Sequence, residues 1–403
     1  VATARRSVRD GSWSTCSVAE RQAVLRQVQA LVVAHREELA FLECLAAGLP
    51  MRHLRDRQVP RAAESFGFFA DTIGQLAGET FEQLPGYLTT VTREAVGVAA
   101  LVSPWNAPLA LASMQIASCI AFGNSCVLKP SEQTPLALLR LMAILKEAGV
   151  PDGVVNLVNG RGSVTGSALC AHPGIDRIAF TGGNVTARRI MSAAAQNLTP
   201  VHFELGGKSA NIVFDDCDLE RAVDGALLGS FSNSGQICIG GSRILLQRSI
   251  AEQFISAFVA RTRALRVGDP LDPATEVGPL AFRAHLERVA GHVDRAREEG
   301  AELLIGGTAL DGGGPGYYMA PSVLRVASNS LAICREEVFG PVATIQVFDS
   351  EDEAWAIAND SDYGLVAYVW TGSLGRALSA QQRLQVGTVW INTSLARDLR
   401  APF

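Results

Sequence analysis

The chain has 403 residues, of which 48% are hydrophobic and 19% are charged, so it is long enough for two or three domains with sizeable cores. Lysine and arginine number 35 against 40 aspartate and glutamate residues, a net charge of −5, and no run of like charge reaches five. This balance disfavours a nucleic-acid groove or a polybasic membrane patch and leaves small neutral or anionic substrates open.

Cysteine and histidine are sparse. Eight cysteines without CxxC spacing do not make a disulfide scaffold and indicate a reducing cytoplasm, and six histidines without an HxxxH or HExxH pair predict no metal site. The first residues, VATARRSVRDGSW, lack the apolar segment of a signal peptide. The longest charge-free stretch, residues 95–128, contains prolines, asparagines and glycines, so we expect buried strand, loop and helix there and not a membrane span.

The first predicted element is a helix. Ser17 and Glu20 have capping-box spacing, and apolar residues then recur at helical intervals to about Cys44. From Val96 onward, short apolar runs alternate with helical segments. The expected strands are 96–102, 126–128, 154–158, 178–180 and 201–203, and the expected helices are 109–121, 134–148, 164–171 and 185–195. This alternation predicts a doubly wound parallel sheet.

A second series follows the first. It comprises expected strands at 211–214, 342–348, 366–370 and 388–392 and expected helices near 218–230, 250–265 and 285–299. The predicted fold class is therefore α/β, with two doubly wound domains. Residues 80–96 alternate apolar and polar residues without a helical stripe, which predicts an excursion of extended strands. Because two exposed strands are marginal alone, we expect them to pair with another subunit.

Cys238 is a candidate nucleophile. It follows an apolar helix in a loop of small residues, where Gly235, Gly240 and Gly241 leave the backbone free to approach a ligand. We expect this loop to open a helix, whose N–H groups would favour the thiolate. The other seven cysteines are expected to be small buried hydrophobic residues.

Two further polar residues come directly after predicted strands. Glu204 ends the strand 201–203 at the sheet edge where open α/β folds bind ligands, and it is a candidate general base, with a solvated surface charge as the alternative. Asn106 lies between Pro104 and Pro108 on a rigid turn suited to aim its amide at an oxyanion. An ordinary Asx turn is the alternative there.

Other segments suit a dinucleotide. Lys129 and Glu132 end a strand with a cation and an acid, which suits the hydroxyls of an adenosine ribose. An acid at such a position repels a 2′-phosphate, so NAD is favoured over NADP. Gly182 and Gly183 precede a helix whose N-terminus could receive a pyrophosphate.

The chain resembles the aldehyde dehydrogenase superfamily in a series of segments that occur in that family's order. They are PWNAP (104–108), KPSE (129–132), FTGGN (180–184), ELGGKS (204–209), GQIC (235–238), EEVFGPV (336–342), NDSDYGL (359–365) and GTVWIN (387–392). The resemblance implies a cytoplasmic homodimer or homotetramer that oxidises a small-molecule aldehyde. It also implies a dinucleotide-binding domain at 1–79 and 97–205, oligomerisation strands at 80–96, a catalytic domain at 206–392, and the start of a C-terminal segment at 393–403.

The resemblance also implies roles for individual residues. Cys238 would attack the aldehyde, and the Asn106 amide with the Cys238 backbone N–H would hold the oxyanion. After hydride transfer to nicotinamide, water activated by Glu204 would hydrolyse the thioester. The expected cofactor is NAD, and the expected cofactor-binding residues are Trp105, Lys129, Glu132, Gly182, Gly183, Glu337 and Phe339.

The substrate is predicted from two short segments. Residues 397–403 and 59–63 resemble the branch that oxidises muconic-type semialdehydes, and Arg61 and Arg400 are the expected ligands of the substrate carboxylate, with surface or domain contacts as the alternative. The phosphate turn departs from the family's FTGSTxxG at Gly183, Asn184 and Ala187. Three other functions stay open: a broad-specificity aldehyde dehydrogenase, a catalytically silent member that acts as a binding protein, and a thiol hydrolase.

Overall fold

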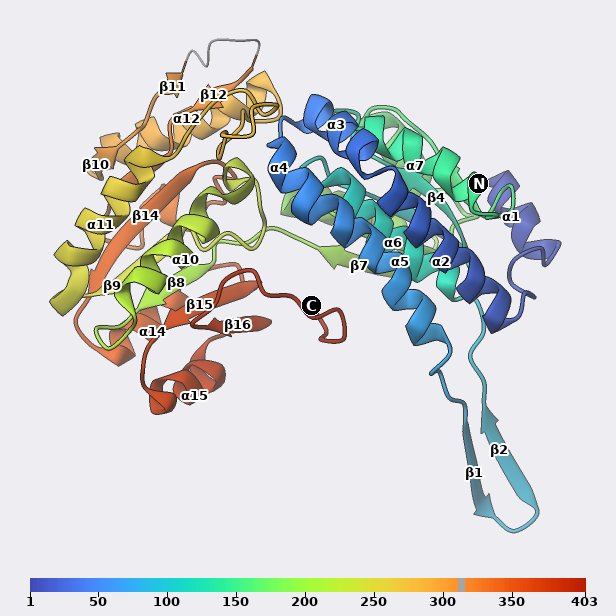
Figure 1. Cartoon of the computed structure of the whole chain (residues 1–403). Coiled ribbons are helices and arrows are strands. Elements are labelled where there is room, and N and C mark those ends of the chain that lie inside the picture. The colour runs from blue at the N-terminus through green and yellow to red at the C-terminus, as the bar shows by residue number, and fades with distance from the viewer. Residues whose placement is uncertain (311–315) are drawn as a thin grey trace. The chain divides into compact units, whose positions relative to one another are not determined.

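The computed structural model describes residues 1–310 and 316–403, which form two compact units (Figure 1). The first unit consists of residues 1–47 and 52–204, and the second consists of residues 48–51 and 205–403. Each unit is built on one mainly parallel sheet that is packed against helices, which confirms the predicted α/β class. The sequence pattern did not indicate that residues 48–51 would cluster with the second unit.

The sheet of the first unit has five parallel strands, all where strands were predicted. They are β3 (Val98–Val102), β4 (Ser125–Lys129), β5 (Val155–Leu157), β6 (Arg177–Thr181) and β7 (Val201–Glu204). Their order in the sheet is β5-β4-β3-β6-β7. The direction of winding therefore reverses between β3 and β6, and open parallel sheets bind ligands outside the carboxyl ends of the strands at such a reversal.

Helices cover this sheet in layers. Helix α6 (Pro108–Ala121) packs on β3 and β4, α7 (Leu136–Glu147) packs on β5, and α9 (Asn184–Ala195) packs on β7. An outer layer of α2 (Val18–Ala34), α3 (Arg36–Ala47) and α5 (Val59–Ile73) stacks on α6 and α7. The remaining helical segments are α1 (Ala2–Arg9), α4 (Met51–His53), α8 (Ser167–Cys170) and π-helical turns at Leu54–Gln58 and Gly162–Gly166.

The single helix predicted from Ser17 to Cys44 is wrong, because this stretch forms two helices. Its predicted start is confirmed: the Ser17 hydroxyl accepts from the Glu20 N–H, and the Glu20 carboxylate accepts from the Ser17 N–H. Helix α2 ends at Ala34 because His35 leaves the helical conformation, with φ −93° and ψ 20°. The His35 ring is then held by Glu38 in the first turn of α3, with 3.0 Å between Nδ1 and Oε2.

The predicted excursion is an antiparallel hairpin of β1 (Glu79–Leu84) and β2 (Tyr87–Val91), which extends beyond the end of α5 (Figure 1). Every residue of both strands is exposed, including five large apolar side chains. These are Phe81, Leu84, Tyr87, Leu88 and Val91. The charge-free stretch 95–128 contains β3, α6 and β4, as predicted, and none of the described helices is long and apolar enough to cross a bilayer.

The sheet of the second unit has seven strands. They are β8 (Ala210–Val213), β9 (Arg243–Gln247), β10 (Glu302–Ile305), β13 (Ser322–Arg325), β14 (Val342–Phe348), β15 (Val366–Trp370) and β16 (Thr388–Ile391). Their order is β10-β13-β14-β9-β8-β15-β16, and β10 is antiparallel to its neighbour whereas the other pairs are parallel. A short pair, β11 (Ala309–Leu310) and β12 (Tyr318–Met319), lies outside this sheet.

Helices pack on both faces of this sheet, because neighbouring residues of its strands point in opposite directions. Ile244 and Leu246 of β9 contact the core beneath α10 (Leu219–Phe231) and α11 (Ala251–Ala264), and Leu245 contacts the core beneath α14 (Glu351–Asn359) and α15 (Leu374–Arg383). The other helical segments are α12 (Arg283–Glu298), α13 (Ala332–Arg335) and 3₁₀ turns at Ser232–Gly235 and Arg248–Ile250.

A buried carboxyl group of the first unit joins α3 to α6. Glu43 has no exposed surface, and its Oε1 accepts from the Leu109 N–H at the start of α6, at 3.2 Å. Burial raises the pKa of Glu43 to about 7, although the hydrogen bond from Leu109 and the charge of Arg61 both act to lower it. In the folded protein Glu43 therefore titrates near neutral pH.

We expect Glu43→Gln to remove part of the pH dependence of folding. The folded state keeps a proton on Glu43 that the unfolded chain releases, so the free energy of unfolding falls as pH rises from the ordinary 4.5 to about 7. This loss is on the order of 3 kcal/mol for the Glu43 carboxyl. Urea unfolding at pH 5 and pH 8 measures it, with the exposed Glu37→Gln of the same helix as control. Equal losses of stability in the wild type and in Glu43→Gln would contradict the prediction.

Candidate active site

Asn106 lies in the turn between β3 and α6, at the reversal of strand order, and is 8% exposed. Pro108 begins α6 at a position where a missing backbone N–H leaves no intrahelical bond unmade. The Trp105 carbonyl accepts from the Thr134 hydroxyl at 3.2 Å, and Glu43 holds the Leu109 N–H. Groups outside the turn therefore fix the backbone on both sides of Asn106.

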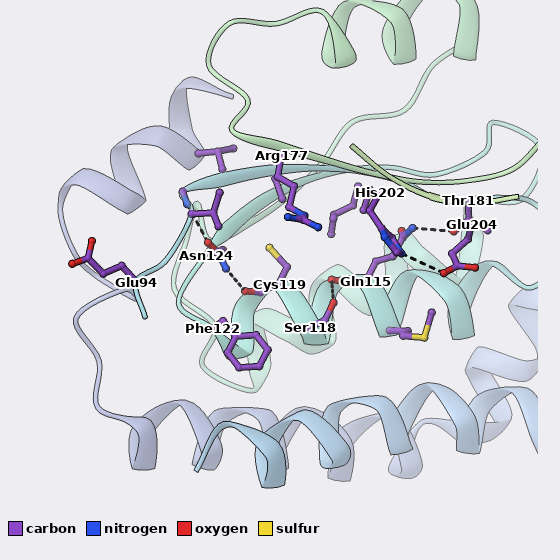
Figure 2. A pocket seen from close by; sticks show the side chains of 17 residues that line it. Glu94, Gln115, Ser118, Cys119, Phe122, Asn124, Arg177, Thr181, His202 and Glu204 are labelled. Atoms are coloured by element: carbon purple, nitrogen blue, oxygen red, sulfur yellow. Dashed lines mark hydrogen bonds and ion pairs between the residues drawn. The ribbon is translucent and has the colours of Figure 1, made fainter. Parts of the chain in front are cut away.

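Glu204 is the last residue of β7, as predicted. The Gly182 N–H donates to its carbonyl oxygen at 3.0 Å, which ties the end of β7 to the turn that follows β6. The Glu204 side chain is 23% exposed, and its Oε1 lies 3.3 Å from His202 Nε2 (Figure 2). Sequence reasoning missed His202, although side chains two residues apart on a strand point to the same face.

Lys129 and Glu132 lie together at the carboxyl end of β4. Lys129 is 3% exposed and its Nζ donates to Glu132 Oε2 at 2.9 Å, and the Gly162 N–H donates to Glu132 Oε1 at 3.2 Å. Burial acts to raise the pKa of Glu132, but these two hydrogen bonds, a third from its own backbone N–H and the charge of Lys129 together outweigh it, so the pKa is lowered. The carboxylate is therefore charged at neutral pH and can accept hydrogen bonds from ribose hydroxyls.

The turn after β6 leads into the N-terminus of α9. Gly183 is the N-cap residue of α9, and a Cβ atom there would meet open space. A glycine cap has no side chain to accept from the first N–H groups of the helix, which leaves them for an anion. Lys129 and Glu132 lie at the carboxyl end of β4, which β3 separates from β6 in the same sheet. They and the turn after β6 lie at the carboxyl ends of parallel strands, so the residues of this unit fit a dinucleotide.

Cys238 lies between α10 and β9, and the expectation that its loop opens a helix is wrong. A strand follows the loop, so no helix N-terminus comes directly after Cys238 to favour the thiolate. The Cys238 backbone is instead packed against Gly207, where a Cβ atom would collide with the Cys238 carbonyl oxygen. The close approach of these two backbone segments therefore requires glycine at position 207.

The backbone before Cys238 is strained. Asn233 and Ser234 both have φ of 55°, and Gly235 has φ of 72°, a conformation that residues with side chains rarely adopt. Buried hydrogen bonds hold it: the Ser234 hydroxyl donates to the Gly278 carbonyl at 2.8 Å, and Asn233 and Gln236 each donate a side-chain amide to the other's carbonyl at 3.1 Å. Such over-determined strain is typical of functional sites.

Glu337 reaches the same glycine segment as Cys238. Its Oε1 accepts from the Gly207 N–H at 3.0 Å, and a Cβ atom at Gly206 would collide with its carboxylate. Burial raises the pKa of Glu337, against the opposing effects of the Gly207 N–H and the positive charge of Lys208. The structure thus brings Cys238 and Glu337 to one segment of the second unit.

Phe339 is the third strained residue of this region, with φ of 59°. The His285 ring supports it: Nε2 donates to the Phe339 carbonyl at 2.7 Å, and Arg288 donates to Nδ1 at 2.8 Å. Burial lowers the pKa of His285 to about 4, so the ring is neutral at pH 7. The two hydrogen bonds then select the tautomer with its proton on Nε2. No motif in the sequence pointed to His285, because the contact depends on the tertiary packing of α12.

The predicted site residues lie at the carboxyl ends of strands in one sheet and at the amino ends of strands in the other. Asn106, Lys129 and Glu204 lie at the carboxyl ends of strands of the first sheet. Cys238, Glu337 and Phe339 precede β9 and β14, which places them at the amino ends of strands of the second sheet. In the first unit alone, therefore, the predicted site residues lie at the carboxyl ends of the strands, where open parallel sheets bind ligands.

The two arginines expected to bind a substrate carboxylate belong to different units. Arg61 lies on α5 of the first unit, where its charge acts on buried Glu43. Arg400 of the second unit is 81% exposed and forms an ion pair with Asp398, with 2.5 Å between Nη2 and Oδ2. Each arginine thus has an acidic neighbour within its own unit.

Comparison with known proteins finds one family throughout. The model of the aldehyde dehydrogenase family matches residues 1–403. The chain is 42% identical over 395 residues to the NADP/NAD-dependent aldehyde dehydrogenase PuuC of Escherichia coli K12, covering 98% of this chain and 79% of the relative. It is 40% identical over 408 residues to the 5-carboxymethyl-2-hydroxymuconate semialdehyde dehydrogenase of Escherichia coli, covering 100% and 86%.

A solved structure of an indole-3-acetaldehyde dehydrogenase in complex with NAD⁺ is 37% identical to the chain. It matches with a TM-score of 0.98 and covers 100% of this chain and 82% of that one. With a family model that matches from the first residue to the last, and relatives at about two-fifths identity over nearly its whole length, the chain belongs to the aldehyde dehydrogenase family.

Proposed function

We propose that this protein oxidises an aldehyde to a carboxylic acid with NAD as hydride acceptor, through a thioester on Cys238. A dinucleotide-binding domain of residues 1–79 and 97–205, most of which lies in the first unit, would bind the cofactor, and a catalytic domain of residues 206–392 would carry the nucleophile. The observation that supports this most is the packing of Gly207 against the Cys238 backbone, because Gly207 lies only three residues after Glu204. The chain itself thus limits how far the proposed base can lie from the loop of the proposed nucleophile.

In the proposed mechanism Cys238 Sγ attacks the aldehyde carbon and forms a thiohemiacetal. The Asn106 side-chain amide and the Cys238 N–H donate to the oxyanion, and the fixed turn around Asn106 means that this donor is oriented before the reaction. Removing one such donor typically lowers kcat by about 100- to 1,000-fold.

NAD, when bound, accepts the hydride from the thiohemiacetal carbon. Lys129 and Glu132 would hold its adenosine ribose, Gly182 and Gly183 would lie at the pyrophosphate, and Glu337 and Phe339 would position the nicotinamide ribose. Trp105 is also proposed to bind the cofactor. Glu204 then takes a proton from the water that attacks the thioester, which releases the acid and restores the thiol. A base for hydrolysis argues against transfer of the acyl group to coenzyme A.

Two substitutions separate the two halves of this reaction. We expect Cys238→Ala to form no NADH, because no thiohemiacetal can form, and we expect Glu204→Gln to give one burst of NADH without steady turnover, because only hydrolysis needs the base. Rapid-mixing absorbance at the NADH band measures both, with Cys16→Ala as the control. Steady NADH formation by Cys238→Ala would contradict the mechanism.

The choice between the two dinucleotides is proposed to depend on Glu132. Its carboxylate is charged and held by Lys129 and Gly162, so it would accept from the ribose hydroxyls of NAD and repel the 2′-phosphate of NADP. We expect Glu132→Gln to lower the preference in kcat/KM for NAD over NADP by about tenfold, equivalent to about 1.4 kcal/mol. The exposed Glu147→Gln is the control, and an unchanged preference in Glu132→Gln would assign the discrimination to other residues.

The substrate is proposed to be a semialdehyde of the muconic type, whose carboxylate pairs with Arg61 and Arg400. The support is the named semialdehyde relative, the segments 59–63 and 397–403, and the small size of Ala107, which follows Asn106. The broad-specificity alternative is supported by the relative PuuC, whose name specifies no single aldehyde.

A matched pair of substrates distinguishes these alternatives. We expect kcat/KM to be at least about tenfold higher for a carboxylated semialdehyde than for an aliphatic aldehyde of equal length, because a guanidinium pairs well with a carboxylate. Arg400→Gln should lower kcat/KM for the carboxylated substrate alone, and the exposed Arg263→Gln should lower neither. Equal kcat/KM values for both substrates would favour broad specificity.

The β1–β2 hairpin is proposed to build the homodimer or homotetramer. Its support is that all of its residues are exposed and that five of them are large and apolar. An isolated two-stranded hairpin is marginally stable in water, whereas pairing with the sheet edge of another copy would satisfy its free backbone groups.

A further inference from the structure

His202 lies beside the proposed base Glu204, and the proposed mechanism gives it no role. They are two residues apart on β7, so both side chains lie on one face of the sheet, and His202 Nε2 is 3.3 Å from Glu204 Oε1. The two differ in exposure, since 53% of the His202 side chain is accessible against 23% for Glu204. His202 thus connects the proposed base to solvent.

The pair faces a cavity of about 400 Å³ within the first unit (Figure 2). Strand register explains its lining: Thr181 of β6 is opposite Glu204 and Ala179 is opposite His202, so alternate residues of neighbouring strands share this face. Helix α6 closes the other side with Met114, Gln115, Ser118 and Cys119, together with its C-cap residue Phe122. A cavity of this size has room for several water molecules beside Glu204.

We propose that His202 positions the Glu204 carboxylate and carries the proton that Glu204 gains during thioester hydrolysis to the water of this cavity. The inference rests on the proposed role of Glu204 as the hydrolytic base. A base that is protonated in each turnover must be deprotonated before the next. The imidazole ring has two nitrogens, and His202 places Nε2 beside Glu204 while 53% of its side chain is accessible, so the ring can pass a proton from the carboxyl group to water.

The proton balance of the step is simple. The attacking water loses a proton to a Glu204 carboxylate oxygen, and the Glu204 O–H then breaks as the proton moves to His202 Nε2. This transfer uses the tautomer of His202 that carries its proton on Nδ1, because Nε2 must accept. The imidazolium then releases its Nδ1 proton to cavity water, which leaves an Nε2–H that donates to the Glu204 carboxylate. Exchange with cavity water, which adds a proton at Nδ1 and removes the one at Nε2, restores the starting tautomer. No oxidant or reductant takes part.

The other charged or titratable side chains that line the cavity are Glu94, before β3, Arg177 at the start of β6, and Cys119 of α6. Arg177 is opposite Ala99 of β3, whereas His202 is opposite Ala179, so the residue directly across from His202 on β6 is uncharged. Among the residues lining this cavity, the one ion pair of His202 that the structure records is with Glu204.

The test uses the full-length protein with NAD and its aldehyde, and with p-nitrophenyl acetate, which acylates a reactive cysteine without a dinucleotide. We expect His202→Ala to keep the burst of NADH but to lower the steady rate of both reactions at least about tenfold, because only deacylation uses the pair. Added imidazole should restore the steady rate in proportion to its free-base concentration. His202→Gln, which can donate to Glu204 but cannot carry a proton, should stay slow with imidazole.

Arg177→Gln is the matched control, because it changes another polar side chain of the same cavity and should keep the wild-type rates. A wild-type steady rate in His202→Ala, full recovery in His202→Gln, or no effect of imidazole on His202→Ala would each overturn the inference. Failure of the proposed function looks different: the wild type itself would give no burst, or Cys238→Ala would turn over.

Discussion

The site depends on the absence of side chains at Gly206 and Gly207. These two residues follow Leu205, just after the last strand of the first sheet. A Cβ atom would collide with the Glu337 carboxylate at Gly206 and with the Cys238 carbonyl oxygen at Gly207. Because the backbone can come this close, its amide at Gly207 also donates to Glu337. One short segment thus sets the positions of two proposed functional groups in the second unit.

Polar groups outside the proposed chemistry hold its parts in place. Glu43 bonds to the start of α6 beside Asn106, and neutral His285 bonds to the strained carbonyl of Phe339. Buried polar groups destabilise a fold unless they are paired, so these contacts restrict each segment to one arrangement. Rigid support of this kind is what an oriented oxyanion donor or a positioned ribose ligand requires.

Local pattern predicted much of the fold, and contacts between distant residues account for what it missed. The alternation of apolar runs and helical segments located all five strands of the first sheet, and the spacing of Ser17 and Glu20 located the start of α2. It missed the break at His35 and the strand after Cys238, because neither has a periodic signal. His202 was visible only once β7 was known to expose that face to a cavity.

The hairpin of β1 and β2 has no hydrophobic core of its own, since each of its strand residues is exposed. Gly86 at its tip, with φ of 82° and open space around it, is accessible to a protease. The rate of proteolytic cleavage at this tip therefore reports whether another subunit covers the β1–β2 hairpin. It does so without any change in the two sheets. It would give a measure of subunit association that needs neither a substrate nor a dinucleotide.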